Sequence, residues 1–190
     1  MGLLVLGLIL FLGVHSASIV APAWRDAQVA RRGEKAWKGL YALVSLVGFV
    51  LLIVGYGAAR ESPMLLYQPP AWTRHLAMLL MLPVFPLLLA AYLPGRLQAA
   101  AKHPMLVAVK AWSVAHLAAN GTLADVLLFG GFLAWAVADR ISLNRRPARP
   151  VQRAPARPLN DVIAVAGGLA LYAAFVWGLH GWLFGMPLVR

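Results

Sequence analysis

The chain has 190 residues, of which 62% are hydrophobic and 12% are charged, and its formal net charge is +11. An ordinary soluble domain has about 25% charged residues, and a domain of this size could not bury so much apolar surface. The composition therefore excludes a soluble globular domain and a disordered chain. The absence of cysteine excludes disulfides, thiolate metal sites and cysteine nucleophiles.

Apolar runs follow one another along the chain. A helix needs about 20 apolar residues to cross a hydrocarbon core of about 30 Å. The third run contains Pro83 and Pro86, which predict a kink, and Asn120-Gly121 is a turn signal that divides a longer run in two. We predict an all-α polytopic membrane bundle, one domain over residues 1–190, with six transmembrane helices at about 2–22, 39–59, 75–93, 105–119, 122–138 and 162–184. A signal peptide is a competing interpretation of the first run, but no Lys or Arg precedes it.

The basic residues fall mainly into three loops between these spans. Five lie in loop 24–38, two in loop 94–104 and six in loop 139–161, so 13 of the 17 lie on one side of a six-span protein. Short cytoplasmic loops carry the excess of Lys and Arg, which predicts that both termini lie outside the cytoplasm. The Pro/Arg-rich part of loop 139–161 is predicted to be an extended linker that either contacts anionic lipid head groups or only anchors the topology. A nucleic-acid partner is not expected, because no aromatic residues alternate with these arginines.

Two of the five histidines are predicted to lie in the middle of the bilayer. At about 1.5 Å per residue, His15 is roughly 12 Å and His116 roughly 18 Å from the same membrane face, and modest tilt removes this difference. Two imidazoles at matching depth on different helices can ligate one haem iron from opposite faces. The alternative is that each makes one interhelical hydrogen bond. A zinc site is disfavoured, since no third ligand has suitable spacing.

Residues that a haem pocket needs occur near this pair. Tryptophans offer apolar walls, or form the aromatic belt of a membrane surface; they are Trp24, Trp37, Trp112 and Trp135. Basic residues toward the predicted cytoplasmic side are candidate partners of haem propionates: Arg25, Lys38, Lys102 and Lys110. We also expect Asp139 and Arg140, at the inner end of the fifth span, to form a local ion pair or a salt-bridged helix end. Asn120 is expected to cap the turn between the fourth and fifth spans. Small residues such as Gly48, Gly55, Gly130 and Gly131 are expected to serve close helix packing.

Three segments carry a resemblance to a known family. They are LFLGVHS at 10–16, KHPMLVAVKAWSVAHLAANG at 102–121 and LLFGGFLAWAVADR at 127–140, in the expected order and at the expected spacing. The sequence resembles the NnrU family, bacterial multi-pass membrane proteins linked to denitrification genes, over nearly the whole chain. The same family includes the zeta-carotene isomerases of plants and cyanobacteria, membrane enzymes that bind haem b and isomerise a cis double bond of a polyene by a redox-gated mechanism.

The resemblance implies roles for single residues. His15 matches the first haem-ligand position of the isomerases, His116 matches the second, and His103 matches a further important position. Ser113 stands where the plant enzymes have a cysteine that is proposed as an alternative iron ligand. An exchange to a thiolate ligand is therefore impossible in this chain, which puts the redox switching of the isomerases in question.

The resemblance thus implies an inner-membrane protein that binds haem b through His15 and His116. Such a protein could be a redox-gated isomerase of a lipophilic polyene, or a non-enzymatic accessory or sensor protein in denitrification that binds nitric oxide. A haem-free structural or transport module is a third alternative. Membrane lipids, haem, and either a polyene or nitric oxide are the expected partners.

Overall fold

The computed structural model describes residues 1–147, 149, 151 and 153–189. Every regular element within these residues is helical, apart from a single β-bridge between Leu65 and Thr122, which confirms the predicted all-α class. Among the described residues, four helical stretches are long and apolar enough to cross a membrane: Gly2–Val20, Glu34–Glu61, Thr73–Ala90 and Asn160–Phe184. Pro104–Ala119 is a shorter apolar helix. The chain is therefore built as a membrane protein, whereas six spans and the location of the termini stay predictions.

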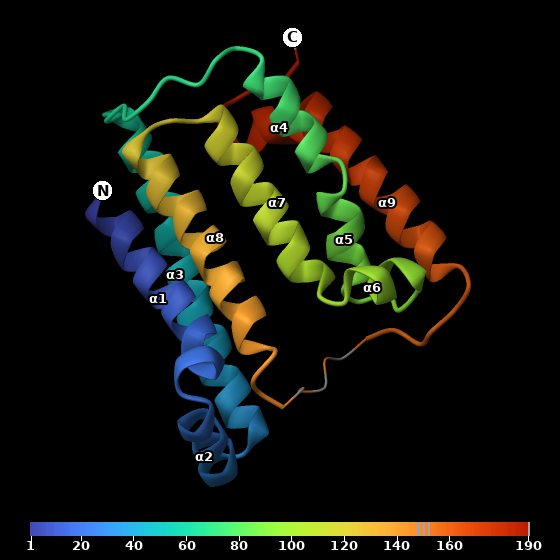
Figure 1. Cartoon of the computed structure of the whole chain (residues 1–190). Helices are drawn as coiled ribbons and strands as arrows, with labels where there is room; N and C mark the ends of the chain where they lie inside the picture. Colours follow the sequence, from blue (N-terminus) through green and yellow to red (C-terminus); the bar gives the residue numbers. More distant parts are fainter. Residues whose placement is uncertain (148, 150, 152, 190) are drawn as a thin grey trace. The chain divides into compact units, whose positions relative to one another are not determined.

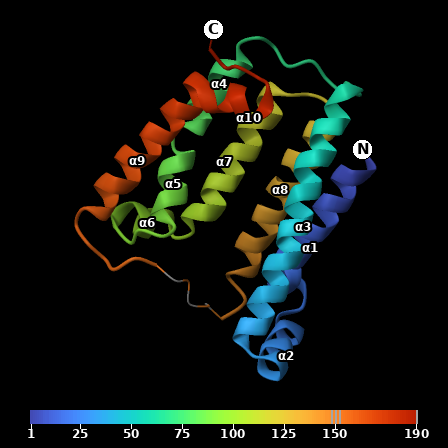
Figure 2. The ribbon, with the colours of Figure 1, turned by 180° about the vertical axis from the view of Figure 1, so that it is seen from behind.

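The chain forms two compact units, Met1–Pro70 with Ala119–Ala148, and Ala71–Ala118 with Arg149–Arg190. The helices of unit 1 are α1 (Gly2–Val20), α2 (Pro22–Arg32), α3 (Glu34–Glu61) and α8 (Leu123–Ser142). In this unit α1 and α3 run side by side in opposite directions, and α8 packs against α1 (Figures 1 and 2). The basic residues that follow α1 and α8 and precede α3 therefore gather at one end of unit 1.

Glycines bring α1 and α3 into close contact. Of the four glycines that were expected to serve helix packing, Gly48 and Gly55 lie at this contact. A methyl group added to Gly55 would overlap the backbone of Leu4, and one added to Gly48 would lie 2.7 Å from a backbone nitrogen of α1. Both glycines thus permit a close approach of two helix backbones, the usual device for packing helices in lipid. The prediction does not hold for Gly130, which faces open space.

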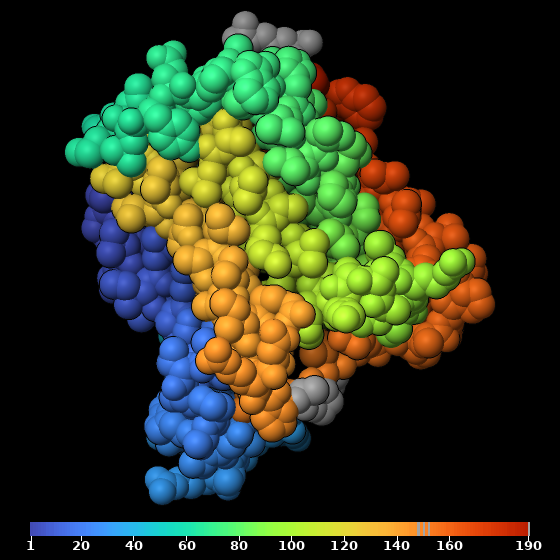
Figure 3. All heavy atoms as spheres, viewed as in Figure 1, coloured from blue at the N-terminus to red at the C-terminus, as the bar shows by residue number. Residues whose placement is uncertain are grey.

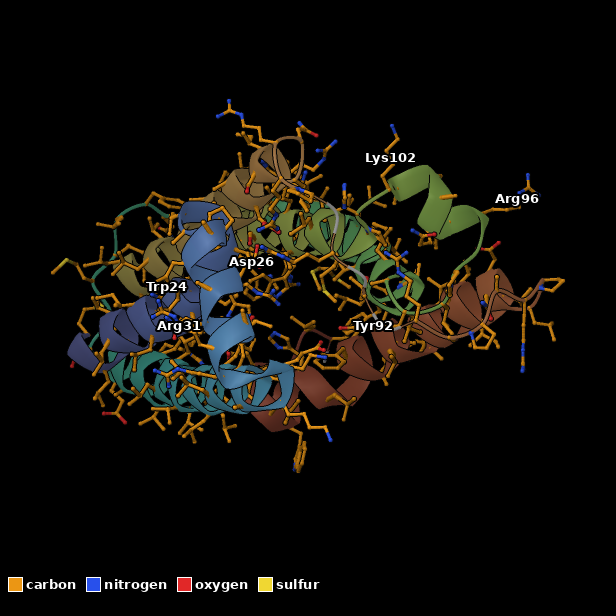
Figure 4. All side chains as sticks on the ribbon, turned by 90° about the horizontal axis from the view of Figure 1, so that it is seen from below. Trp24, Asp26, Arg31, Tyr92, Arg96 and Lys102 are labelled. Atoms are coloured by element: carbon orange, nitrogen blue, oxygen red, sulfur yellow. The ribbon has the colours of Figure 1, made fainter. Side chains whose placement is uncertain are left out.

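Helix α2 lies within a segment that the sequence prediction treated as a loop. Pro22 occupies the first turn, where its missing N–H costs nothing, and Arg31 and Arg32 occupy the last turn, where cations stabilise a helix end. Gly33 then adopts a φ of +80°, which allows the sharp turn into α3. Figure 4 shows α2 crossing the ends of α1 and α3 in unit 1. An amphipathic basic helix of this kind is typical of the membrane surface.

The opposite end of unit 1 is closed by hydrogen bonds between loop 62–70 and the turn before α8. The carbonyl of Gly121 accepts from the N–H groups of Leu66 (2.8 Å) and Tyr67 (3.1 Å), and the Met64 carbonyl accepts from Leu123 N (2.8 Å). Figure 3 shows this green segment lying against the start of α8. The loop is therefore fixed to unit 1 by its backbone.

A carboxylate at the start of α8 joins three elements of unit 1. Asp125, which is 4% exposed, accepts hydrogen bonds from Tyr56 Oη (2.5 Å) and from Thr122 N (2.9 Å) and Oγ1 (2.6 Å). Thr122 and Asp125 form the capping box of α8. Thr122 is thus the N-cap of α8, and the Asn120 carbonyl accepts from Tyr67 Oη at 2.6 Å. Capping of the turn by Asn120 stays a prediction.

We expect Asp125→Ala to lower the free energy of unfolding by about 3 kcal/mol, since it removes a cap and leaves buried donors without an acceptor. Circular dichroism during a denaturant titration of detergent-solubilised protein measures the change. The matched control is Asp26→Ala, which removes an exposed carboxylate that pairs with Arg25 and should cost less than about 1 kcal/mol. Equal losses in the two variants would contradict the structural role of Asp125.

Unit 2 contains the broken span that the sequence predicts. Its helices are α4 (Thr73–Met81), α5 (Val84–Ala90), α6 (Arg96–Ala101), α7 (Pro104–Ala119), α9 (Asn160–Ala174), the π-helix η1 (Phe175–Leu179) and α10 (His180–Phe184). The break lies at Pro83, where Leu82 N bonds to Leu79 O instead of continuing the helix. The Met78 carbonyl accepts from Tyr172 Oη of α9 at 3.0 Å. A neighbouring helix thus supplies the hydrogen bond that the break removes.

Two residues in the first turn of α9 form hydrogen bonds with the start of α6 and with the residue Pro94 shortly before it. The carboxylate of Asp161 accepts from the N–H groups of Arg96 (2.8 Å) and Leu97 (3.0 Å), and Asn160 Nδ2 donates to the Pro94 carbonyl (2.8 Å). Helix α6 is a second helix in a region predicted as a loop. Between α8 and α9, the described residues form no helix or strand, which agrees with the predicted linker, while residues 148, 150 and 152 of that linker lie outside the described residues.

Candidate functional site

His15 is held by its own helix. Its Nδ1 donates to the carbonyl of Phe11, four residues earlier, at 2.6 Å. The ring of Phe11 stacks on the imidazole with centroids 4.3 Å apart. Because a carbonyl oxygen can only accept, Nδ1 carries the proton, and Nε2 is the nitrogen with the lone pair.

Two further aromatic residues of unit 1 contact the His15 ring. Tyr41 of α3 lies at 5.1 Å between ring centroids, and Trp135 of α8 meets the imidazole edge-on at 6.0 Å. Trp135 Nε1 is buried, and no hydrogen-bond acceptor for it exists among the residues that the structure describes. Three helices of unit 1 therefore converge on His15. Sequence reasoning missed Tyr41. Its place within the predicted span 39–59 is the one signal in the sequence that could have drawn attention to it.

His116 of α7, in unit 2, repeats this local geometry. Its Nδ1 donates to the carbonyl of Trp112 at 2.9 Å, and the Trp112 ring lies 5.3 Å away. Three residues earlier, Ser113 is fully buried, and within the described part of the chain its hydroxyl has no hydrogen-bond partner. His15 and His116 thus each have a fixed tautomer and a fixed ring direction, as metal-ligating histidines usually do.

The other predicted residues of α6 and α7 occupy different settings. Lys102 ends α6 with a φ of 58°, a conformation that L-residues rarely adopt, and its side chain is exposed. The carbonyl of His103 accepts from Leu106 N (3.0 Å) and starts α7. Lys110 is half-buried on α7. Figure 4 labels Lys102 on the exposed side of α6.

Arg25, another candidate propionate partner, already has contacts in unit 1. Its Nη1 donates to Asp26 at 2.9 Å, and its guanidinium lies 6.0 Å from the ring centroid of Trp37. Trp37 in turn meets Trp24 edge-on at 5.7 Å. These three side chains connect α2 to the start of α3, so a structural role accounts for Arg25.

An apolar groove of about 260 Å³ lies between α1 and α3 and is bounded by α2. Its lining residues are Gly13, Val14, Ala17, Trp24, Trp37, Leu40, Tyr41 and Val44. Tyr41 belongs to this groove and also contacts His15. A lipophilic molecule in the groove would therefore lie one side chain away from that imidazole.

Comparison with protein-family models gives a match over nearly the whole chain. A family model described as NnrU protein matches residues 3–188. The chain belongs to the NnrU family. The match spans both compact units, in agreement with the resemblance read from the three sequence segments. No curated protein and no solved structure matches the chain.

The residues present fit a cofactor that brings its own equatorial ligands. Among the described residues, no group of three or more His, Cys, Asp or Glu side chains could hold a bare metal ion. A haem iron already has four porphyrin nitrogens and needs only axial ligands, such as neutral imidazoles. His15 and His116 each provide an oriented imidazole of the kind that such an axial position takes.

Proposed function

We propose that this NnrU-family protein binds haem b within the membrane, with His15 and His116 as axial ligands. The observation that carries the proposal is the matched geometry of the two histidines, in which Nδ1 donates to a carbonyl of the same helix. This bond raises the basicity of Nε2 and fixes the ring. The proposal includes six spans in a bacterial inner membrane with both termini outside the cytoplasm, as the loop charges indicate.

Bound haem would supply one-electron redox chemistry and an exchangeable axial position. The protein's own residues would orient the two imidazoles and keep water from them. Phe11, Tyr41 and Trp135 pack around His15, and this apolar shell favours its neutral form. Ser113 places a hydroxyl where the plant isomerases have a thiol, so this chain offers no thiolate ligand at that position.

We propose a lipophilic polyene as the molecule acted on, in an isomerisation like that of the zeta-carotene isomerases. The apolar groove beside Tyr41 supports this choice, because it opens among membrane helices and its lining is almost entirely apolar. A chain of conjugated carbons could enter from the bilayer and lie beside Tyr41. The role in nitric oxide metabolism stays a prediction from the family resemblance.

An absorption spectrum tests the haem proposal. Protein expressed with ample haem supply and purified in detergent should show a Soret band and the sharp visible bands of six-coordinate b-type haem. Protein without bound haem under these conditions would overturn the proposal.

A second experiment tests isomerisation of the polyene. Haem-loaded protein is produced in bacteria that accumulate a cis polyene, and chromatography should detect the trans isomer. No conversion by haem-loaded protein would exclude the isomerase while leaving haem binding intact.

A further inference from the structure

A second pocket, of about 400 Å³, lies in unit 1 where α1 ends, α2 begins and α8 ends. It is lined by Ile19, Pro22, Ala138, Ile141, Ser142, Arg145 and Arg146. One wall is therefore apolar, and the other carries a hydroxyl and two guanidinium groups. This combination of surfaces is typical of a site for an amphiphilic anion.

The pocket lies at the membrane boundary of unit 1. Ile19 follows His15 by about one helical turn, and Ala138 follows Trp135 by three residues, so the pocket continues the contact between α1 and α8 toward their ends. Helix α1 ends at Val20, where its apolar run ends too. The amphipathic helix α2 begins at the pocket with Pro22. With the end of this apolar run at the membrane boundary, the apolar wall would face the acyl region and the arginines would lie at the level of lipid head groups.

The arginines of the pocket are only partly neutralised. Arg146 Nη2 donates to Asp139 Oδ1 at 2.5 Å, and both side chains are largely buried, with 14% and 13% exposed. Of the two expected arrangements, the salt-bridged helix end is confirmed by this pair, whereas Arg140 donates to Asn144 and forms no local ion pair with Asp139. Asp139 lies one turn before the end of α8, so the later Arg146 can fold back onto it.

One nitrogen of the buried guanidinium lacks a partner. Arg146 Nη1 is buried, and no acceptor among the described residues bonds to it. A buried donor without an acceptor is costly, and a guanidinium has N–H groups on both terminal nitrogens. The exposed Arg145 pairs with no carboxylate of the described chain. Two guanidinium charges against one carboxylate leave the pocket with a net positive charge.

We propose that this pocket binds the phosphate of an anionic phospholipid. Arg146 Nη1 and the Arg145 guanidinium donate to the phosphate oxygens, and Ser142 adds a hydroxyl. One acyl chain lies along the apolar wall formed by Ile19 and Ile141. A lipid with net negative charge is favoured over a zwitterionic one, since its headgroup brings no ammonium close to the two arginines. This site is separate from the His15 contacts, so it stands or fails independently of haem binding.

The test uses full-length protein in nanodiscs that contain equal amounts of phosphatidylglycerol and phosphatidylcholine, followed by native mass spectrometry of the released complex. Wild-type protein should retain phosphatidylglycerol selectively. Arg145→Gln should weaken its binding about tenfold, the effect of losing one charge-assisted contact. Arg140→Gln is the matched control, because it removes the same charge at the same helix end but does not line the pocket. Equal effects of the two variants would show that only net charge matters and would overturn the site.

A steric variant provides a second, independent test. Ala138→Phe fills the pocket without altering its charge, and it should abolish selective retention of phosphatidylglycerol while the circular dichroism spectrum stays unchanged. Folded Ala138→Phe protein with normal lipid retention would overturn the proposal. If Arg145→Gln instead releases haem and leaves lipid retention unchanged, the pocket holds a haem propionate, and the lipid site is wrong.

Discussion

Replacement of His15 or His116 by alanine is expected to remove most bound haem from the protein. Each variant deletes an axial nitrogen whose ring is fixed by a bond to its own helix. Loss of a supporting partner of a metal ligand costs 10- to 100-fold in affinity, roughly, and loss of the ligand itself should cost at least as much. The Soret absorbance relative to protein concentration measures the loss.

His180→Ala is the matched control for this experiment. His180 also donates through Nδ1 to a backbone carbonyl, that of Met186 at 2.7 Å, but it lies near the chain end instead of mid-membrane. His180→Ala should keep the full haem content. Added imidazole should restore the absorption band in His15→Gly, since a free imidazole can occupy the space of the missing ring. A normal spectrum in either His15→Ala or His116→Ala would exclude that residue as a ligand.

Gly55→Ala is expected to lower the free energy of unfolding by about 2 kcal/mol, the typical cost of adding atoms to a tightly packed contact. The new methyl group would overlap the backbone of Leu4, and a backbone cannot move aside as a flexible side chain can. Helices α1 and α3 must therefore separate, or α1 must shift along α3. Thermal denaturation in detergent, followed by circular dichroism, measures the effect.

Gly57→Ala separates packing from helix propensity. Gly57 lies on the same helix, and nothing lies within 4 Å of a methyl group added there. Alanine is a better helix former than glycine by up to about 1 kcal/mol, so this variant should be as stable as the natural protein or slightly more stable. If Gly55→Ala is also neutral, then α1 and α3 do not approach each other as closely as the structure indicates.

Helices and their breaks could be predicted from the sequence because they depend on local chemistry. Long apolar runs predict the helices, Pro83 removes a backbone donor at the break, and Asn120-Gly121 ends α7. Helices α2 and α6 escaped prediction, because short polar helices between spans have no long apolar run. Their formation depends on end effects such as Pro22 at the start of α2 and the distant Asp161 carboxylate at α6.

The site could be predicted only in part. Depth along a helix selected His15 and His116, since depth follows from counting residues. Counting residues could not identify the hydrogen-bond and ion-pair partners of polar side chains, because these partners depend on the path of the backbone in three dimensions. Asp139 bonds to Arg146 and not to its neighbour Arg140, and Arg25 pairs with Asp26 at the surface. Nearness in sequence is therefore an uncertain guide, since the adjacent Arg25 and Asp26 pair whereas the adjacent Asp139 and Arg140 do not.

Unit 1 is held at both ends by elements suited to the boundary between lipid and water. At one end lies α2 with the 54% exposed Trp24, and at the other lies loop 62–70 with Leu65 and Leu66, which are 62% and 51% exposed. Between them α1 spans about 28 Å, close to the thickness of the hydrocarbon core. Sliding along the membrane normal would expose one anchor to water and bury the polar groups of the other. In a bilayer these two anchors would fix the immersion depth of His15, and bilayers made with shorter or longer acyl chains should deform around unit 1 instead of shifting it.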